Sequence, residues 1–250
     1  MTKTRRPVSE LPADPAHLRL SYSHDHPAEP YDFEDTLEAW HVSIRTYHFE
    51  EEECEGGCTA ECQELIDSGR EIGYVRLWRV RDYTGDNRWE AADAESGDLE
   101  AIAATVFDVR TDEYSQAFEE FIECPVGDLL ILDRVFLSKE WRGFGLGPVF
   151  AAEAIRRLAG GCCAVAAQPG LGEWPEGVTE VPRAYREEAT KKIAALWRSI
   201  GFRDFAGGVQ LFDPALREPS ELLGKARRHL PALSSAYSGR PVGPSTEPHA

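Results

Sequence analysis

The sequence is short of the features that mark membrane and secreted proteins. Nowhere do about 18 apolar residues run together, so no membrane span is expected. Residues 1–10 carry Lys3, Arg5 and Arg6 with no apolar run behind them, which argues against a signal peptide. Six cysteines, unevenly placed in 250 residues, are too few for a disulfide scaffold and agree with a reducing compartment. We therefore expect a soluble, cytoplasmic protein.

Basic residues are also scarce. Lysine and arginine number 27 against 44 acidic residues, which gives a formal net charge of −17. A charge of this sign repels nucleic acid and anionic lipid and is compatible with a cationic partner. We expect no nucleic-acid or membrane partner, and the sequence leaves a homodimer open.

The composition indicates one domain with tails. With 42% hydrophobic residues the chain can bury a good core. The proline-bearing residues 1–16 are predicted to be a flexible arm, residues 17–213 the domain, and residues 214–250 a mostly disordered tail with one short helix at 220–230. Strands are predicted over 37–49, 71–83, 128–137, 162–168, 202–205 and 209–212, and helices over 99–107, 114–122, 149–158 and 183–200.

The most informative stretch is 128–168, which is predicted to be a strand, a glycine-rich turn, a helix and a second strand. The turn, RGFGLG at 142–147, has three glycines in six positions just before a helix. Such a turn lets the backbone approach a ligand and directs unpaired N–H groups at an anion. The pattern therefore indicates phosphate binding, and a glycine cap without a ligand is the plainer alternative.

Two common phosphate loops do not fit this turn. A dinucleotide loop needs G-x-G-x-x-G, but counting from Gly143 the sixth position is Pro148, and no acidic residue is evident about 20 positions later. A Walker loop needs Lys-Ser or Lys-Thr after its glycines, and neither follows here.

The segment LSKEWRGFGLG at 137–147 resembles the pyrophosphate loop of the GCN5-related N-acetyltransferase (GNAT) superfamily, V-x-P-E-[YF]-R-G-x-G-[IL]-G. A second segment, TKKIAALWRSIGF at 190–202, resembles the later motif of that superfamily, N-x-x-A-x-x-L-Y-x-x-x-G-F, more loosely. The resemblance implies an α/β (α+β) fold with a mixed, splayed central sheet flanked by helices. It also implies an N-acetyltransferase that moves an acetyl group from acetyl-CoA, as co-substrate, to a primary amine of a small molecule or peptide by direct attack.

The resemblance also assigns residues to the cofactor. The strand backbone at Val135, Phe136 and Leu137 would pair with the pantetheine arm, and one N–H there would polarise the thioester carbonyl. The diphosphate would lie on the loop, whose assigned residues are Arg142, Gly143, Phe144, Gly145, Leu146 and Gly147. Pro148 has no N–H, so this loop has one donor fewer than a typical member. Arg142 has an equal alternative, which is hydrogen bonding within the protein.

Asp133 is the candidate catalytic base. If the strand alternates regularly, Asp133 lies in one row with Leu129, Ile131, Val135 and Leu137, where a carboxylate is out of place. Its alternative role is an ion pair with an arginine such as the cross-strand neighbour of Arg134.

Trp197 stands where many relatives have a tyrosine that protonates the departing thiolate, and indole has no proton to give near neutral pH. Tyr185 is a candidate substitute, and Trp197 as a core aromatic residue is the plainer interpretation. The departure keeps a second hypothesis open, which is a non-catalytic CoA-binding or regulatory module. The Gly- and Pro-rich residues 169–182 form a long loop that suggests a lid.

Three cysteines, Cys54, Cys58 and Cys62, form C-x3-C-x3-C, and Cys124 or His48 could complete a zinc site. The spacing is not a standard one for zinc. On a helix these cysteines would share one stripe, so cysteines facing the core are the simpler interpretation, and no metal is expected.

Overall fold

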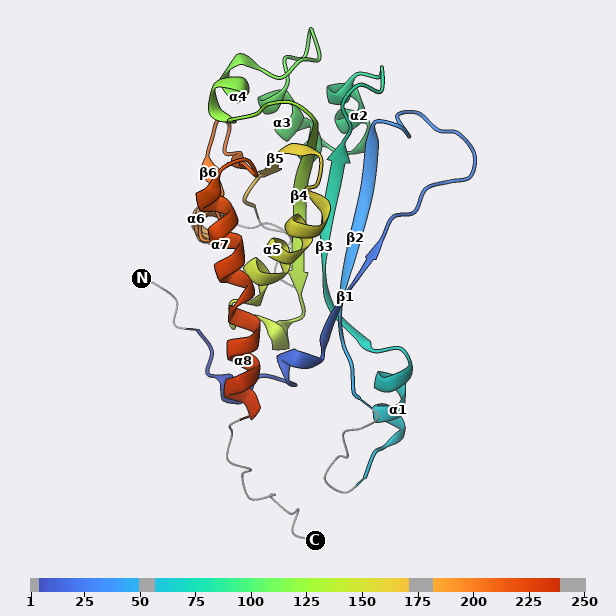
Figure 1. The fold of residues 1–250 in the computed structure, drawn as a ribbon, viewed down its shortest axis with the longest axis vertical. Coiled ribbons are helices and arrows are strands. Elements are labelled where there is room, and N and C mark those ends of the chain that lie inside the picture. Colours follow the sequence, from blue (N-terminus) through green and yellow to red (C-terminus); the bar gives the residue numbers. More distant parts are fainter. Residues whose placement is uncertain (1–4, 50–56, 171–181, 239–250) are drawn as a thin grey trace.

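One seven-stranded sheet organises the protein (Figure 1). The computed structural model describes residues 5–49, 57–170 and 182–238. The strand order is β1-β2-β3-β4-β5-β7-β6, and β4 and β5 are the one parallel pair among the described strands. The bounds are β1 Leu18–Ser23, β2 Leu37–Thr46, β3 Arg70–Val80, β4 Asp128–Leu137, β5 Cys162–Ala167, β6 Arg203–Asp204 and β7 Gln210–Phe212.

Helices connect and cover these strands. Their bounds are α1 Ala60–Asp67, α2 Arg88–Glu95, α3 Gly97–Val106, α4 Gln116–Phe121, α5 Leu146–Leu158, α6 Arg183–Arg198, α7 Arg217–Arg227 and α8 His229–Ser238. Four of them begin at residues whose side chains accept a backbone N–H of the first turn, as is usual for helix N-caps. These residues are Thr59, Asn87, Ser96 and Ser115.

The sheet separates two hydrophobic cores. On one face α5 to α8 pack on the strands, and this core includes Val75, Leu132, Phe150 and Trp197. On the other face α2, α3 and α4 form a second core that includes Leu129 and Ile131 of β4. A sheet with helices on both faces buries half of the residues of β4 and all of those of β5, which explains the continuous apolar run of β5.

The parallel strands β4 and β5 stay together over only part of their length. Their register runs from Asp128 paired with Cys162 to Ile131 paired with Ala166. From Leu132 to Leu137, β4 continues beside β3, while β5 ends at Ala167 and its other edge pairs with β7. The predicted class, an α/β fold with a mixed, splayed central sheet flanked by helices, is confirmed.

A bulge in β4 changes the predicted side-chain row. Val75 and Leu77 are two positions apart on β3 and pair with Val135 and Leu132, which are three positions apart on β4. The extra residue reverses the alternation that follows it. Leu132 and Val135 therefore pack into the same core, whereas Leu129 and Ile131 belong to the other. The predicted single row through Asp133 is wrong for this reason.

Most predicted elements are present, with exceptions near the ends of the chain and in its acidic segments. β1, α1 and α2 are not among the predicted elements. The prediction of disorder after the short C-terminal helix is wrong up to Ser238, because α8 extends to that residue and its Leu233 is buried in the core. Residues 5–16 also pack, since Leu11 is buried there. The division into arm, domain and tail stays a prediction. Within the described ranges, no helix is long and apolar enough to cross a membrane.

Candidate functional site

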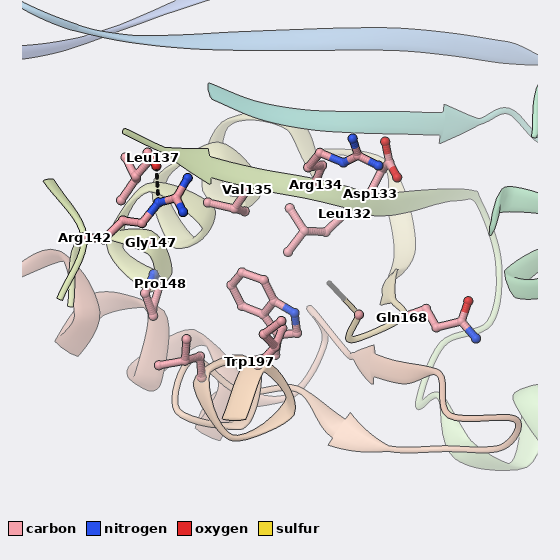
Figure 2. A pocket seen from close by; sticks show the side chains of 13 residues that line it. Leu132, Asp133, Arg134, Val135, Leu137, Arg142, Gly147, Pro148, Gln168 and Trp197 are labelled. Carbon is pink, nitrogen blue, oxygen red and sulfur yellow. Dashed lines mark hydrogen bonds between the residues drawn. The ribbon is translucent and has the colours of Figure 1, made fainter. Parts of the chain in front are cut away.

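A pocket of about 200 Å³ lies where β4 and β5 diverge (Figure 2). Its walls are β4 from Leu132 to Leu137, the first turn of α5 at Gly147 and Pro148, the end of β5 at Gln168, and one face of α6. The divergence opens this space because the β4 edge beyond Ile131 has no β5 residue paired to it. The pocket therefore joins the glycine turn to the strand predicted to hold the pantetheine arm.

The glycine turn has the backbone shape of an anion cradle. Gly143 and Gly145 have φ angles of +93° and +78°, in the left-handed region that favours glycine. Gly145 is also the N-cap of α5 and brings no capping side chain, and the first turn of α5 contains no acidic residue. The N–H groups of this turn and the positive end of the helix dipole thus remain available to an anionic ligand.

The side chains of the remaining residues assigned to the cofactor lie in different places. Phe144 and Leu146 are almost fully buried in the core, so only their backbone groups could serve a ligand. Val135 lines the pocket, whereas Phe136 stacks on Tyr74 on the other face of the sheet, with ring centroids 5.4 Å apart. The proposed use of the backbone at both positions stays a prediction.

Arg142 makes the internal contacts that were its alternative role. Its Nε donates to the carbonyl oxygen of Leu137, drawn as a dashed line in Figure 2, and its guanidinium lies 5.0 Å from the centre of the Phe136 ring. These contacts brace the turn between β4 and α5. They also engage one carbonyl of the strand segment assigned to pantetheine.

The N-terminal segment brings two arginines to the glycine turn, and α8 brings a histidine. Arg6 donates its backbone N–H to the carbonyl of Gly143 (3.0 Å), and its guanidinium donates to the carbonyl of Glu140 (3.0 Å). The guanidinium of Arg5 lies beside Gly145, and its Nη1 is 3.2 Å from Nε2 of His229, which in turn is 2.8 Å from the carbonyl oxygen of Phe144. No local motif indicates this arrangement, because its parts come from the two ends of the chain.

Asp133 lies at the pocket wall and is paired with Arg76. The Arg76 Nε donates to Oδ2 of Asp133, whose side chain is only 9% exposed. Arg76 is the cross-strand partner of Arg134, so the alternative role predicted for Asp133 is observed. Because Asp133 also lines the pocket, the pair could still orient a cationic acceptor, and its catalytic role stays a prediction.

Trp197 is buried in the core and lines the pocket, facing β4 from α6 (Figure 2). Its interpretation as a core aromatic residue is confirmed. Tyr185, the substitute acid suggested from sequence, is 53% exposed and does not line this pocket. It lies twelve residues before Trp197 on the same helix, about 18 Å away along the axis. The suggested lid falls largely on residues outside the described ranges.

The cysteines of β5 are core residues. Burial raises the pKa of Cys163 to about 11 and also raises the pKa of Cys162. A thiol that stays protonated at neutral pH is a poor nucleophile. This observation speaks against an acyl group carried on either of them.

Some of the residues considered for a zinc site lie close together in the structure. His48, Cys58 and Cys62 cluster at one end of the molecule, with their ligand atoms within 4.8 Å of one another. Cys54 lies outside the described residues, and Cys124 is exposed and follows α4. Cys58 is exposed and Cys62 is only partly covered in α1, so for these two cysteines the interpretation that they face the core is wrong.

Comparisons with known proteins find likeness among solved structures. No protein-family model matches the chain, and no curated protein matches it. A mutant of the toxin AtaT, bound to the C-terminus of the antitoxin AtaR, aligns over 81% of this chain and 95% of its own, at 11% identity and a TM-score of 0.35. A mutant of KacT aligns over 82% and 98%, at 12% identity and a TM-score of 0.36. At this level neither structure carries an argument about activity or partners.

Proposed function

We propose that the protein is an acetyl-CoA-dependent N-acetyltransferase that acts on a primary amine by direct attack. One observation carries the proposal: the first turn of α5 that follows the glycine cradle lines the same pocket as the free edge of β4. Gly147 and Pro148 of that turn face the pocket together with Val135 and Asp133. An anion site that adjoins a partly apolar pocket suits a long ligand with a diphosphate at one end and a thioester at the other.

The residues present fit such a ligand. The turn offers N–H groups at a helix N-terminus that no side chain caps, and Gly147 has no side chain to stand in the pocket. Acetyl-CoA supplies an activated acetyl thioester. The edge of β4 would orient the pantetheine arm, and a β4 N–H would stabilise negative charge on the carbonyl oxygen. Trp197 would exclude water from the reacting end.

The acceptor amine must lose a proton, because an alkylamine has a pKa of about 10.4 and is charged at neutral pH. In the proposal Asp133 accepts this proton, directly or through water, and Arg76 holds the carboxylate in place. The net charge of −17 is compatible with a cationic acceptor of small-molecule or peptide type.

A non-catalytic CoA-binding or regulatory module is the second candidate. Three observations favour it: the carboxylate of Asp133 already has an arginine partner, Trp197 replaces the tyrosine of many relatives, and Tyr185 does not line the pocket. The same cradle would then bind acetyl-CoA without turnover.

Two measurements on the full chain distinguish the candidates. Calorimetric titration tests whether the protein binds acetyl-CoA. Mass spectrometry of reactions with a panel of small amines and peptides tests for a product heavier by one acetyl group. Binding with an acetylated product supports the enzyme, and binding without one across the panel supports the module. If acetyl-CoA does not bind, both are overturned.

A further inference from the structure

The connection between β2 and β3 gathers three soft metal ligands away from the pocket. Nε2 of His48, just after β2, lies 3.3 Å from Sγ of Cys58, and both lie within 4.8 Å of Sγ of Cys62 in the first turn of α1. Figure 1 shows α1 beyond the end of the sheet, on the side opposite α2 and α3. None of the three residues lines the pocket, so the cluster is separate from the candidate CoA site.

Helix α1 is not held in place by a hydrophobic core. It is eight residues long, none of them is buried, and an isolated helix of this length is marginal in water. Glu61 of α1 forms an ion pair with Arg70 at 2.6 Å, but both side chains are exposed, and such pairs contribute little. A cross-link at its first turn would supply the stability that burial does not.

We propose that His48, Cys58 and Cys62 bind a zinc ion. Thiolate and imidazole ligands together select zinc among the common divalent ions of cells. Zinc–sulfur bonds of about 2.3 Å place two sulfur atoms of a tetrahedral site about 3.8 Å apart, so the observed cluster needs shifts of about 1 Å to close on the ion. Three protein ligands leave the fourth position for solvent or one further ligand.

Zinc binding would release one proton from each thiol to solvent and would take the imidazole in its neutral form. The ion would tie the end of β2 to the start of α1 and so fix the connection between β2 and β3.

Zinc content is the direct test, made on the full chain kept reduced, reconstituted with zinc and passed through a desalting column. The expected result is about one equivalent of zinc per chain for the wild type. His48→Asn, Cys58→Ser and Cys62→Ser should each weaken zinc affinity about tenfold or more in competition with a chromophoric chelator. The matched control is Cys124→Ser, which removes another exposed cysteine and should retain the wild-type value.

Two readouts keep the test independent of variant folding. Cobalt substitution of the wild type should give the thiolate charge-transfer and d–d absorption bands of a tetrahedral site. Removal of zinc by a chelator should accelerate amide hydrogen exchange in α1 while leaving β4 and α5 unchanged. The proposal is overturned if the wild type retains well under one equivalent, or if the three ligand variants retain as much zinc as Cys124→Ser.

Discussion

Asp133 and Arg76 form an ion pair across β3 and β4, at the point where β4 carries its bulge. The bulge sets two residues of β4, Asp133 and Arg134, against one residue of β3. Asp133 is nearly buried at the pocket wall, whereas Arg76 is partly exposed. The pair therefore places one fixed carboxylate beside the pocket proposed for the thioester, and it gives the catalytic hypothesis a defined test.

Asp133→Asn removes the base and keeps a side-chain oxygen that can accept from Arg76. We expect kcat to fall about 100-fold or more, because positioned general bases contribute about 10² to 10⁴, with little change in acetyl-CoA affinity. Asp128→Asn is the matched control, since Asp128 also lies on β4 and pairs with an arginine of β3, Arg79, but does not line the pocket. Equal kcat in both variants would contradict the catalytic role and show that Asp133 serves only as a structural partner of Arg76.

Gly147→Ala tests the cradle without disturbing the fold. A Cβ at this position would meet Cγ1 of Val135 at 3.9 Å, an ordinary contact, and alanine is the better helix residue. We expect thermal stability to be kept or raised while acetyl-CoA affinity falls about tenfold, because the methyl group would stand in the pocket. In the control, Gly224→Ala in α7, the new methyl meets no atom within 4 Å, and affinity should not change. Unchanged affinity in Gly147→Ala would mean that the ligand does not approach α5 here.

Arg5 is expected to supply charge to the bound diphosphate, because its guanidinium lies beside Gly145. A hydrogen bond to a charged group contributes about 1.5–3 kcal/mol, so Arg5→Ala should weaken acetyl-CoA binding about tenfold and reduce the salt dependence of that binding. Arg217→Ala, at an exposed arginine that pairs with Glu221 in α7, is the control. Calorimetry at two salt concentrations measures both effects, and identical behaviour of the two variants would contradict the assignment.

Trp197→Tyr introduces the residue that the later motif of the GNAT superfamily, which residues 190–202 resemble, has at this position. Since Trp197 lines the pocket from α6, a phenol there could protonate the leaving thiolate, and turnover should rise or stay unchanged. Tyr185→Phe is the comparison and should have no effect, because Tyr185 is exposed and does not line the pocket. A steep fall in turnover for Trp197→Tyr would show that the indole itself has a role. Steady-state rates of acetyl-CoA consumption, followed by mass spectrometry, decide between these outcomes.

Features of this protein that depend on residues close together in the sequence could be predicted, and features that depend on residues far apart in the sequence could not. The unit from β4 to β5 could be predicted because its signals are local: apolar runs, a glycine turn and a helical period. The row through Asp133 could not, because the bulge depends on pairing with β3. The arginines and the histidine at the glycine turn could not be predicted either, since Arg5 and His229 meet only in the folded chain. Helix α2 does have a local signal in the sequence, because Asn87 and Glu90 are spaced as an N-cap and its N3 residue.

Glu153 gives a pH-dependent prediction for the packing of α7 on α5. Its carboxylate accepts from Arg156 at 2.5 Å and from Arg227 of α7 at 2.6 Å. The hydrogen bond from Arg156 is the largest cause that holds the pKa of Glu153 below its ordinary value. Burial, the second-largest effect, opposes this shift, and the charges of Arg156 and Arg227 and the hydrogen bond from Arg227 add to the lowering. The folded state therefore favours the charged form. The resulting stability is present above the unfolded pKa, about 4.3, and is lost as the pH falls through the lower folded pKa.

Glu153→Gln keeps the shape of the side chain and removes its charge. We expect a lower urea midpoint than wild type at pH 7, and a difference that shrinks as the pH falls below about 4.3, because protonation then neutralises Glu153 in the wild type as well. Glu188→Gln is the control, since Glu188 pairs with Lys192 in an exposed position on α6 and such pairs contribute little. Urea titrations of the three proteins across this pH range measure the effect. A difference between Glu153→Gln and wild type that does not depend on pH would show that packing, and not the charge on Glu153, connects α5 to α7.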